Sequence, residues 1–576
     1  MTPEDSAFAS ASVISGRLAV PASHSRIAMA LLALLLASLA VQVLGVFHRN
    51  INWDEFLFLS NVYRVANRET VGLLQTPYAH LFGWLTRIGG DEITQITAAR
   101  ALFLVVWAGS LALLYALARR LLDPLGALAG VALFALFSYS VTHAASFRID
   151  GLLLPVLLAV ALFLLKPTTG RVAAAGALSG VALALTIKAS LWAPAFAGVL
   201  AVGLWHEQHR FKSVLAGAVA AIVTFAGLML AHSWWLSAGP APTVSSDGLK
   251  DIGFRMLLED GFLPRSDVLG LAVMQNPVTS ILVLAGLVLT IAEVRRAPVR
   301  RRALVLLLLA LPMLSVALYA NAWPYAYIVL MPTACLMAGH AFSRFVCGGD
   351  MARVAAWGVC VVAALPMVAS AWSLRLDQQE HQKQVLAIVH TLFNEPVAYI
   401  DKGGMIPSFP MQPVFLSRWG MKNYREANVP VFARYVRETH PPLVIVNTPI
   451  LEVWDENMLE RIEPHFRLLA EDVEALRAAY APYWGAIYLA GRQWRDLGEA
   501  ESVSFAIVIA SDYTLVSRGS VKVDGALYAP GATLSLAAGP HTLQTAQAEP
   551  DLRLLWGKGT KIPAVEPSSA PIYTGL

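Results

Sequence analysis

Long uncharged apolar runs dominate the first two thirds of the chain. The first of them, residues 27–47, has no charged residue over more than twenty positions. A helix rises about 1.5 Å per residue, so about 20 residues cross the roughly 30 Å hydrocarbon layer of a membrane. The pattern therefore predicts a polytopic α-helical membrane protein with about eleven spans, at residues 27–47, 99–118, 125–142, 151–165, 172–187, 190–205, 213–231, 277–292, 303–320, 324–342 and 354–371.

Charge in the connections between spans predicts the orientation. Two connections are long, residues 48–98 and 232–276, and the others are short. Lys and Arg gather in alternate short loops, with five arginines between residues 295 and 302 alone. Because cytoplasmic loops carry this excess, we expect the N-terminal tail, residues 1–26, in the cytoplasm. Both long loops and the C-terminus then lie on the extracytoplasmic side of the inner (plasma) membrane.

After Trp372 the apolar runs end and the pattern becomes that of a soluble region. Short buried strands at 397–401 and 443–447, followed by helical patterns, predict an extracytoplasmic α/β domain over residues 372–492. Beyond it, alternating strands and turns such as Asp524-Gly525 predict a β-rich, sandwich-like module over residues 493–576. The last fifteen or so residues are rich in Pro, Ser and Ala and are expected to form a loose tail.

Composition supports the membrane assignment and narrows the chemistry. Hydrophobic residues make up 57% of the chain and charged residues 14%, against about a quarter charged in soluble proteins. The net charge of +4 gives no reason to expect a nucleic-acid partner. The three cysteines all precede residue 372, and no Cys/His spacing is typical of a zinc site. We therefore expect no cofactor and no disulfide in the exported region; a divalent metal at an acid pair is possible but not favoured.

The conspicuous charges sit at the outer ends of the predicted spans. Asp54 and Glu55 follow the first span, Arg148 and Asp150 precede the fourth, and Lys188 follows the fifth. No charge lies near the centre of any predicted span, whereas coupled transporters usually need ionisable groups there. Each feature also has a plain structural interpretation: helix-start acids, an interfacial ion pair and a snorkelling lysine. Aromatic residues near the outer span ends, Trp53, Trp234, Trp235, Trp323 and Tyr325, are typical of an interfacial anchoring belt.

The order of these motifs resembles that of the GT-C membrane glycosyltransferases, in the bacterial branch of protein O-mannosyltransferases and the aminoarabinose (lipid A) transferase. The matching elements are the acid pair, the segment Thr76-Pro77-Tyr78-Ala79-His80, the Arg-x-Asp of residues 148–150, and Lys188. Family members commonly have Pro where Ile149 stands. The resemblance covers roughly residues 27–235, and the C-terminal region matches no family.

The resemblance implies an outward-facing enzyme that takes a sugar from a polyprenyl-phosphate donor. An acceptor hydroxyl needs a positioned base, and the departing phosphate needs cations, so one acid and two cations suffice for an inverting displacement. The roles it implies are Asp54 as base with Glu55 in support, Lys188, Arg148 and Arg255 on the donor phosphate, and Asp150, His80 and Tyr78 shaping the site. Arg255 belongs to a predicted amphipathic interfacial helix in the second long loop.

Two other classes of function stay open from the residues. The chain could be a transporter or lipid flippase, or a non-catalytic scaffold whose exported region binds polysaccharide. Eleven spans are more than a scaffold needs for anchoring. The sequence does not name the sugar, nor whether the acceptor is a glycan, lipid A or protein.

Overall fold

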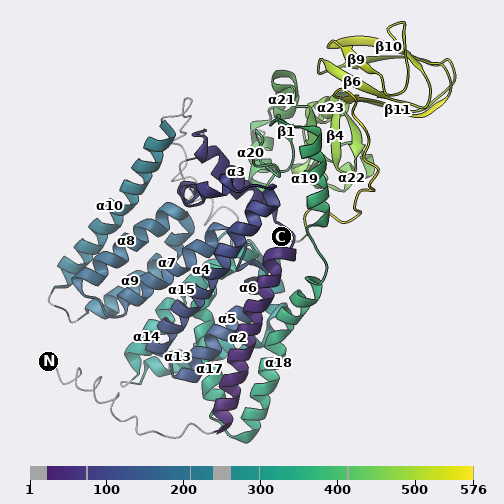
Figure 1. Cartoon of the computed structure of the whole chain (residues 1–576). Helices are drawn as coiled ribbons and strands as arrows, with labels where there is room; N and C mark the ends of the chain where they lie inside the picture. The colour runs from purple at the N-terminus through teal and green to yellow at the C-terminus, as the bar shows by residue number, and fades with distance from the viewer. Residues whose placement is uncertain are drawn as a thin grey trace. The chain divides into compact units, whose positions relative to one another are not determined.

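The computed structural model describes residues 22–574, except 70, 73–74, 206, 208, 238–260, 297–298 and 411–413 (Figure 1). The chain forms two compact units. The first contains residues 1–47, 72–78 and 100–375, and the second contains residues 48–71, 79–99 and 376–576. Parts of the first long loop therefore belong with the C-terminal region, a division that the order of the predicted segments does not indicate.

The first unit is helical. Its elements are α2 (Ala22–His48), α4 (Glu92–Leu121, which begins in the second unit), α5 (Pro124–Leu136), α6 (Ser138–His143), α7 (Ile149–Leu164), α8 (Thr169–Leu185), η2 (Ile187–Trp192), α9 (Ala193–Leu204), α10 (Arg210–Ser237), α12 (Ser266–Gln275), α13 (Pro277–Val294), α14 (Arg300–Leu309), α15 (Leu311–Leu314), η4 (Ser315–Ala317), η5 (Pro324–Ala326), α16 (Tyr327–Leu330), α17 (Pro332–Val346) and α18 (Asp350–Ser373).

Helices occupy every predicted span, although some spans, such as residues 303–320, are divided among short helices. Within the described residues, six are long and apolar enough to cross a membrane, and a seventh crossing is possible where η5 and α16 meet α17 at a bend of 65°. The others are shorter, among them α5, α7 and α8. The chain is thus a multi-pass membrane protein, as predicted, and the number eleven stays a prediction.

Small residues let two of these helices pack closely. Figure 1 shows α8 beside α10. A methyl group added to Gly176 would lie 2.0 Å from the carbonyl oxygen of Gly217, and one added to Gly180 would lie 2.6 Å from that of Ala221. Small residues at such crossings are the usual means of helix association in membranes, where burial of apolar surface supplies little driving force. Elsewhere α10 exposes large apolar side chains, including Phe211, Ile222 and Leu230, as a lipid-facing helix does.

The second unit mixes helices and sheet. Its elements are α3 (Trp53–Ala66), η1 (Pro77–Arg87, which begins in the first unit), α19 (Glu380–Leu392), β1 (Tyr399–Ile400), α20 (Arg418–Ala427), α21 (Val431–Thr439), β2 (Leu443–Ile445), η6 (Pro449–Leu451), α22 (Glu456–Arg461), η7 (Pro464–Phe466), α23 (Ala470–Ala479), β3 (Tyr480–Trp484), β4 (Ile487–Leu497), β5 (Ser502–Ile507), β6 (Ser511–Val516), β7 (Val521–Val523), β8 (Ala526–Tyr528), β9 (Thr533–Leu536), β10 (Gly539–Thr545) and β11 (Glu549–Trp556).

One sheet runs through both predicted parts of the C-terminal region. Its order is β1-β2-β4-β11-β6-β9, with β3 also paired to β4. A second sheet, β5-β10-β7-β8, shares a core with it that includes Phe505, Leu515, Val523 and Leu554. The sandwich-like arrangement is as predicted. The boundary expected at residue 493, however, falls inside β4, because this strand pairs with β2 at one end and with β11 at the other.

The C-terminal residues pack against other parts of the second unit and do not form the loose tail that we expected. The Trp484 indole N–H donates to the carbonyl of Val565 (2.6 Å), and the Asn50 side-chain amide donates to that of Ile572 (2.9 Å). The side chain of Ile572 is buried. Composition alone suggested a loose segment here because Pro, Ser and Ala bury little surface, but backbone carbonyls of the segment serve as acceptors.

Candidate functional site

Arg148 and Asp150 stand at the start of α7. Arg148 is the extended residue before the helix, and Asp150 lies in its first turn, where an acid is favoured by the helix dipole. Gly151 follows, and a methyl group there would lie 2.7 Å from the ring of Phe103, so α4 can approach this helix end only at a glycine. The side chains of Arg148 and Asp150 are 5% and 2% exposed, and their Nε and Oδ2 atoms are 3.8 Å apart.

Lys188 and Tyr325 complete this group. Helix α8 ends at extended Thr186, and η2 then presents Lys188, whose Nζ lies 2.6 Å from Oδ1 of Asp150. The guanidinium carbon of Arg148 lies 3.5 Å from the centre of the Tyr325 ring, and Lys188 Nζ lies 4.7 Å from it. We call Arg148, Asp150, Lys188 and Tyr325 the cation cluster. Residues from three separate parts of the sequence thus meet at helix ends.

The cation cluster has the electrostatics of an anion site. Two cations lie together against one carboxylate. The Tyr325 ring holds the cations through its electron-rich face, which is worth roughly 0.5–2 kcal/mol and uses none of their N–H donors. In a site with little water, such donors are well suited to a phosphate oxygen.

Asp54 and Glu55 lie in the second unit, at the start of α3. Asn52 is the N-cap: its side chain accepts from the backbone N–H of Asp54 (3.0 Å), and Glu55 Oε1 accepts from the backbone N–H of Asn52 (3.2 Å). This is a capping box, in which two otherwise unpaired helix-end donors are satisfied. Glu55 is 1% exposed, whereas Asp54 is only partly buried. The two adjacent acids therefore have different surroundings, and it is the Glu55 side chain that takes part in the capping box.

Lys402 lies near Asp54 and was not a candidate from the sequence. It follows β1, and its Nζ lies 3.2 Å from the centre of the Trp53 ring. Burial lowers the pKa of Lys402 from 10.5 to about 8, against the attraction of Asp54 and, more weakly, Asp401, which raise it. Its backbone N–H donates to Oδ1 of Asn447 (2.8 Å), just beyond β2. The proposed base thus has a cationic neighbour held by the sheet.

Asp401, beside Lys402, has a structural task. It is 1% exposed, and its carboxylate accepts from the backbone N–H groups of Gly404 and Met405, both at 2.7 Å. Burial raises its pKa, and these hydrogen bonds partly oppose the rise. Because β1 and β2 are parallel, their carboxyl ends, with Lys402 and Asn447, meet at one edge.

Tyr78, His80 and Arg255 are the remaining predicted residues. Tyr78 is buried in η1, in the part that belongs to the first unit, and His80 is exposed in the part that belongs to the second. Arg255 and its expected interfacial helix lie outside the described residues. Among the described residues, no three His, Cys, Asp or Glu side chains are grouped so as to hold a metal ion.

Three of the aromatic residues expected to anchor the membrane lie against cations. Trp53 contacts Lys402, Tyr325 contacts Arg148 and Lys188, and Trp323 lies 4.1 Å from the guanidinium carbon of Arg265. Trp234, by contrast, is 74% exposed, as an anchor would be. An aromatic residue near a span end fits both roles, so the sequence could not distinguish them.

Comparison with known proteins places this arrangement in a known fold. No family model matches the chain, and no curated protein matches it. Among solved structures, it is similar to ArnT from Cupriavidus metallidurans bound to undecaprenyl phosphate, with a TM-score of 0.52 and 14% identity over 72% of this chain and 92% of that one. It is also similar to the apo oligosaccharyltransferase of Archaeoglobus fulgidus, with a TM-score of 0.52 and 10% identity over 91% and 94%.

Both of these proteins belong to the GT-C superfamily. The chain has the GT-C fold. The resemblance drawn from the order of its motifs is thereby confirmed at the level of fold. The archaeal likeness extends over 91% of the chain and so reaches well into the C-terminal region, for which the sequence offered no resemblance.

Proposed function

We propose that this GT-C protein is a membrane glycosyltransferase that moves a sugar from a polyprenyl-phosphate donor to an acceptor hydroxyl on the extracytoplasmic side. The observation that carries the proposal is the cation cluster: two nearly buried cations held together by one carboxylate and one aromatic ring. The crystal structure of ArnT with undecaprenyl phosphate supports a lipid phosphate as the ligand of this fold.

Lys188 and Arg148 bind the donor phosphate in this proposal. As the bond between the sugar and the phosphate breaks, negative charge grows on the departing oxygen, and prepositioned cations stabilise it most at that moment. Asp150 keeps both side chains in place and prevents their mutual repulsion. Phosphate is a good leaving group, so no general acid is required.

Asp54 is the proposed general base. It removes the proton from the acceptor hydroxyl as the oxygen attacks the anomeric carbon, and a single displacement of this kind inverts that centre. Its partial exposure beside buried Glu55 supports this division of roles. Glu55 then acts through the capping box that orients Asp54. His80, Tyr78 and Arg255 remain proposed substrate contacts, and no metal is part of the proposal.

The proposal is tested with the purified full chain in lipid nanodiscs and a polyprenyl-phosphate-linked sugar. A charged hydrogen bond contributes about 1.5–3 kcal/mol, so Lys188→Met and Arg148→Met are each expected to lower transfer by about 10- to 150-fold. Lys166→Met, which changes an exposed lysine in another loop, is the matched control and should retain full activity.

Two results would contradict the proposal. The cation cluster would not be the donor site if both variants transferred sugar at the rate of the control. If the chain in liposomes moved a solute or a lipid and transferred no sugar, the transporter or flippase interpretation would replace this one.

A further inference from the structure

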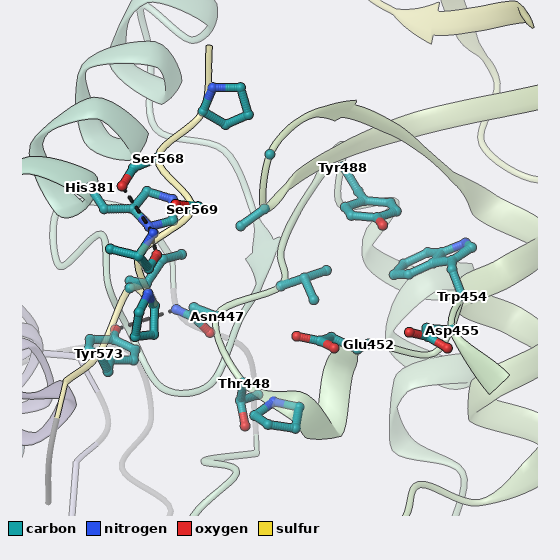
Figure 2. Close-up of a pocket in the computed structure, with 18 of the residues that line it drawn as sticks. His381, Asn447, Thr448, Glu452, Trp454, Asp455, Tyr488, Ser568, Ser569 and Tyr573 are labelled. Carbon is teal, nitrogen blue, oxygen red and sulfur yellow. Dashed lines mark hydrogen bonds between the residues drawn. The ribbon is translucent and has the colours of Figure 1, made fainter. Parts of the chain in front are cut away.

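A cleft of about 810 Å³ opens in the second unit beyond the carboxyl end of β2 (Figure 2). Its size is within the ~300–1,000 Å³ typical of small-molecule sites. One wall consists of the segment after β2 and strand β4, with Glu452, Trp454, Asp455 and Tyr488. The facing wall contains His381 of α19 and the C-terminal residues 567–573. The packed C-terminal segment is thus part of the cleft.

Aromatic and charged groups line this cleft together. The rings of Trp454 and Tyr488 stack with their centres 4.1 Å apart, and both side chains are partly exposed. Glu452 and Asp455 contribute two carboxylates and Arg495 one guanidinium, so the lining has one negative charge in excess. Burial, with a smaller effect of Asp455, raises the pKa of Glu452.

His381 supplies a buried polar atom that no protein group satisfies. Its side chain is 9% exposed, and its Nδ1 lies in hydrogen-bond contact with the carbonyl of Ala570. Its Nε2 is buried and has no hydrogen-bond partner within the part of the chain that the structure describes. A buried nitrogen of this kind costs about 1–3 kcal/mol unless a ligand or water bonds to it. His381 therefore adds a polar side chain to this wall of the cleft.

We propose that this cleft binds a saccharide, neutral or carrying one amino group, and that it recognises a glycan acceptor; the second part rests on the proposed transferase function. Carboxylates only accept hydrogen bonds and a guanidinium only donates them, while a saccharide offers hydroxyl groups that do both. The apolar face of a sugar ring fits an aromatic platform such as Trp454 and Tyr488. Two carboxylates against one arginine disfavour an anion, and the polar lining disfavours a lipid chain.

The position of the cleft within the unit supports the acceptor role. Tyr573, at its edge, lies in edge-to-face contact with Trp53, with ring centres 5.9 Å apart. Asn447, in the cleft wall, accepts from the Lys402 backbone N–H and donates to the Tyr573 hydroxyl (3.4 Å). The wall of the cleft is therefore continuous with the residues that surround Asp54.

Saturation-transfer NMR on the full chain in detergent micelles tests the binding directly, without requiring transfer. The probes are disaccharides of glucose, N-acetylglucosamine and glucosamine, with inorganic phosphate and tetralysine as competitors. We expect at least one disaccharide to bind. Glu452→Gln should weaken its affinity about tenfold, and Trp454→Ala should abolish binding. Trp454→Phe keeps an aromatic ring at this position and should retain most of the affinity, which distinguishes loss of the ring from misfolding. Trp419→Ala, which removes a tryptophan of the same unit outside the cleft, is the control and should bind normally.

The outcomes separate this inference from the proposed function. Saccharide binding that Glu452→Gln weakens, in a protein that transfers no sugar, would support the cleft and refute the transferase. The cleft would be refuted if the protein transferred sugar and both saccharide binding and the acceptor KM were unchanged in Glu452→Gln and in Trp454→Ala. Binding of phosphate or tetralysine in place of every disaccharide would also overturn it, as would no binding at all.

Discussion

Replacing Lys402 with methionine should make the second unit more stable at neutral pH. The side chain is largely buried, and burial lowers its pKa from 10.5 to about 8. At 1.36 kcal/mol per pKa unit, the ammonium costs the folded state up to about 3 kcal/mol. The contact of its Nζ with the Trp53 ring, whose centre is 3.2 Å away, stabilises the folded state by roughly 0.5–2 kcal/mol. Lys402→Met keeps the packing and removes the charge, so we expect a net gain of about 1–2 kcal/mol.

The pH dependence of this gain follows from proton binding. Between pH 8 and 10.5 the unfolded chain still binds the proton that folded Lys402 has lost, so the wild-type protein gains stability from this group as the pH rises. Below pH 8 both states are protonated and the cost is complete. The advantage of Lys402→Met should therefore be largest at pH 7 and should vanish near pH 10.5.

Thermal unfolding of the full chain in detergent at pH 7 and pH 10 measures this effect. A gain of 1–2 kcal/mol corresponds to about 2–8 °C for a unit of this size. Lys422→Met, which removes another lysine near a tryptophan in the same unit (Nζ to ring centre 5.5 Å), is the control and should change stability by less than about 0.5 kcal/mol. A Lys402→Met variant that is less stable at pH 7, or equally favoured at both pH values, would refute the reasoning. We also expect this variant to lose transfer activity, because a costly cation beside Asp54 is retained for function.

Substitutions at four further positions test the site and the helix packing. Asp54→Asn should leave the melting temperature unchanged and lower sugar transfer by about 10²–10⁴-fold, measured with a polyprenyl-phosphate-linked donor. Glu55→Gln preserves the capping box and should keep most activity, whereas Glu55→Ala should destabilise α3 by about 0.5–2 kcal/mol; inactivity of the glutamine variant would make Glu55 catalytic. Asp150→Asn leaves two nearly buried cations without their carboxylate and should cost about 3–5 kcal/mol, seen as a lower melting temperature. Gly176→Leu should separate α8 from α10 and reduce the yield of folded protein in membranes; a normal yield would contradict the packing described.

The sequence predicted the features that depend on local pattern. Helices lie in each predicted span, and Asp524-Gly525 makes the turn between β7 and β8, where both residues have positive φ. The cations and acids at the span ends also stood out, because charge is rare in such a chain. Each of these features can be recognised from the residues that are adjacent in the sequence.

The features that the sequence did not reveal depend on distant contacts. Nothing near Lys402 in the sequence indicates that it packs on Trp53, some 350 residues earlier, or that Asn447 accepts from its backbone N–H. Tyr325 resembles any aromatic residue at a span end until it is seen between two cations. The C-terminal residues were expected to be loose because composition does not record their backbone carbonyls, which Trp484 and Asn50 use.

The two units use the same arrangement at their candidate sites: a cation laid on an aromatic ring beside a carboxylate. Arg148 and Lys188 share Tyr325 and Asp150, and Lys402 lies on Trp53 with Asp54 near it. A carboxylate alone would neutralise a buried cation and occupy its donors, whereas an aromatic face attracts it and leaves its N–H groups directed elsewhere. A buried cation of this kind is costly to maintain and adds little to stability. The presence of such a cation in both units is therefore better explained by a need for fixed positive charge. The proposed departure of a phosphate and the proposed orientation of a carboxylate base both require such a charge.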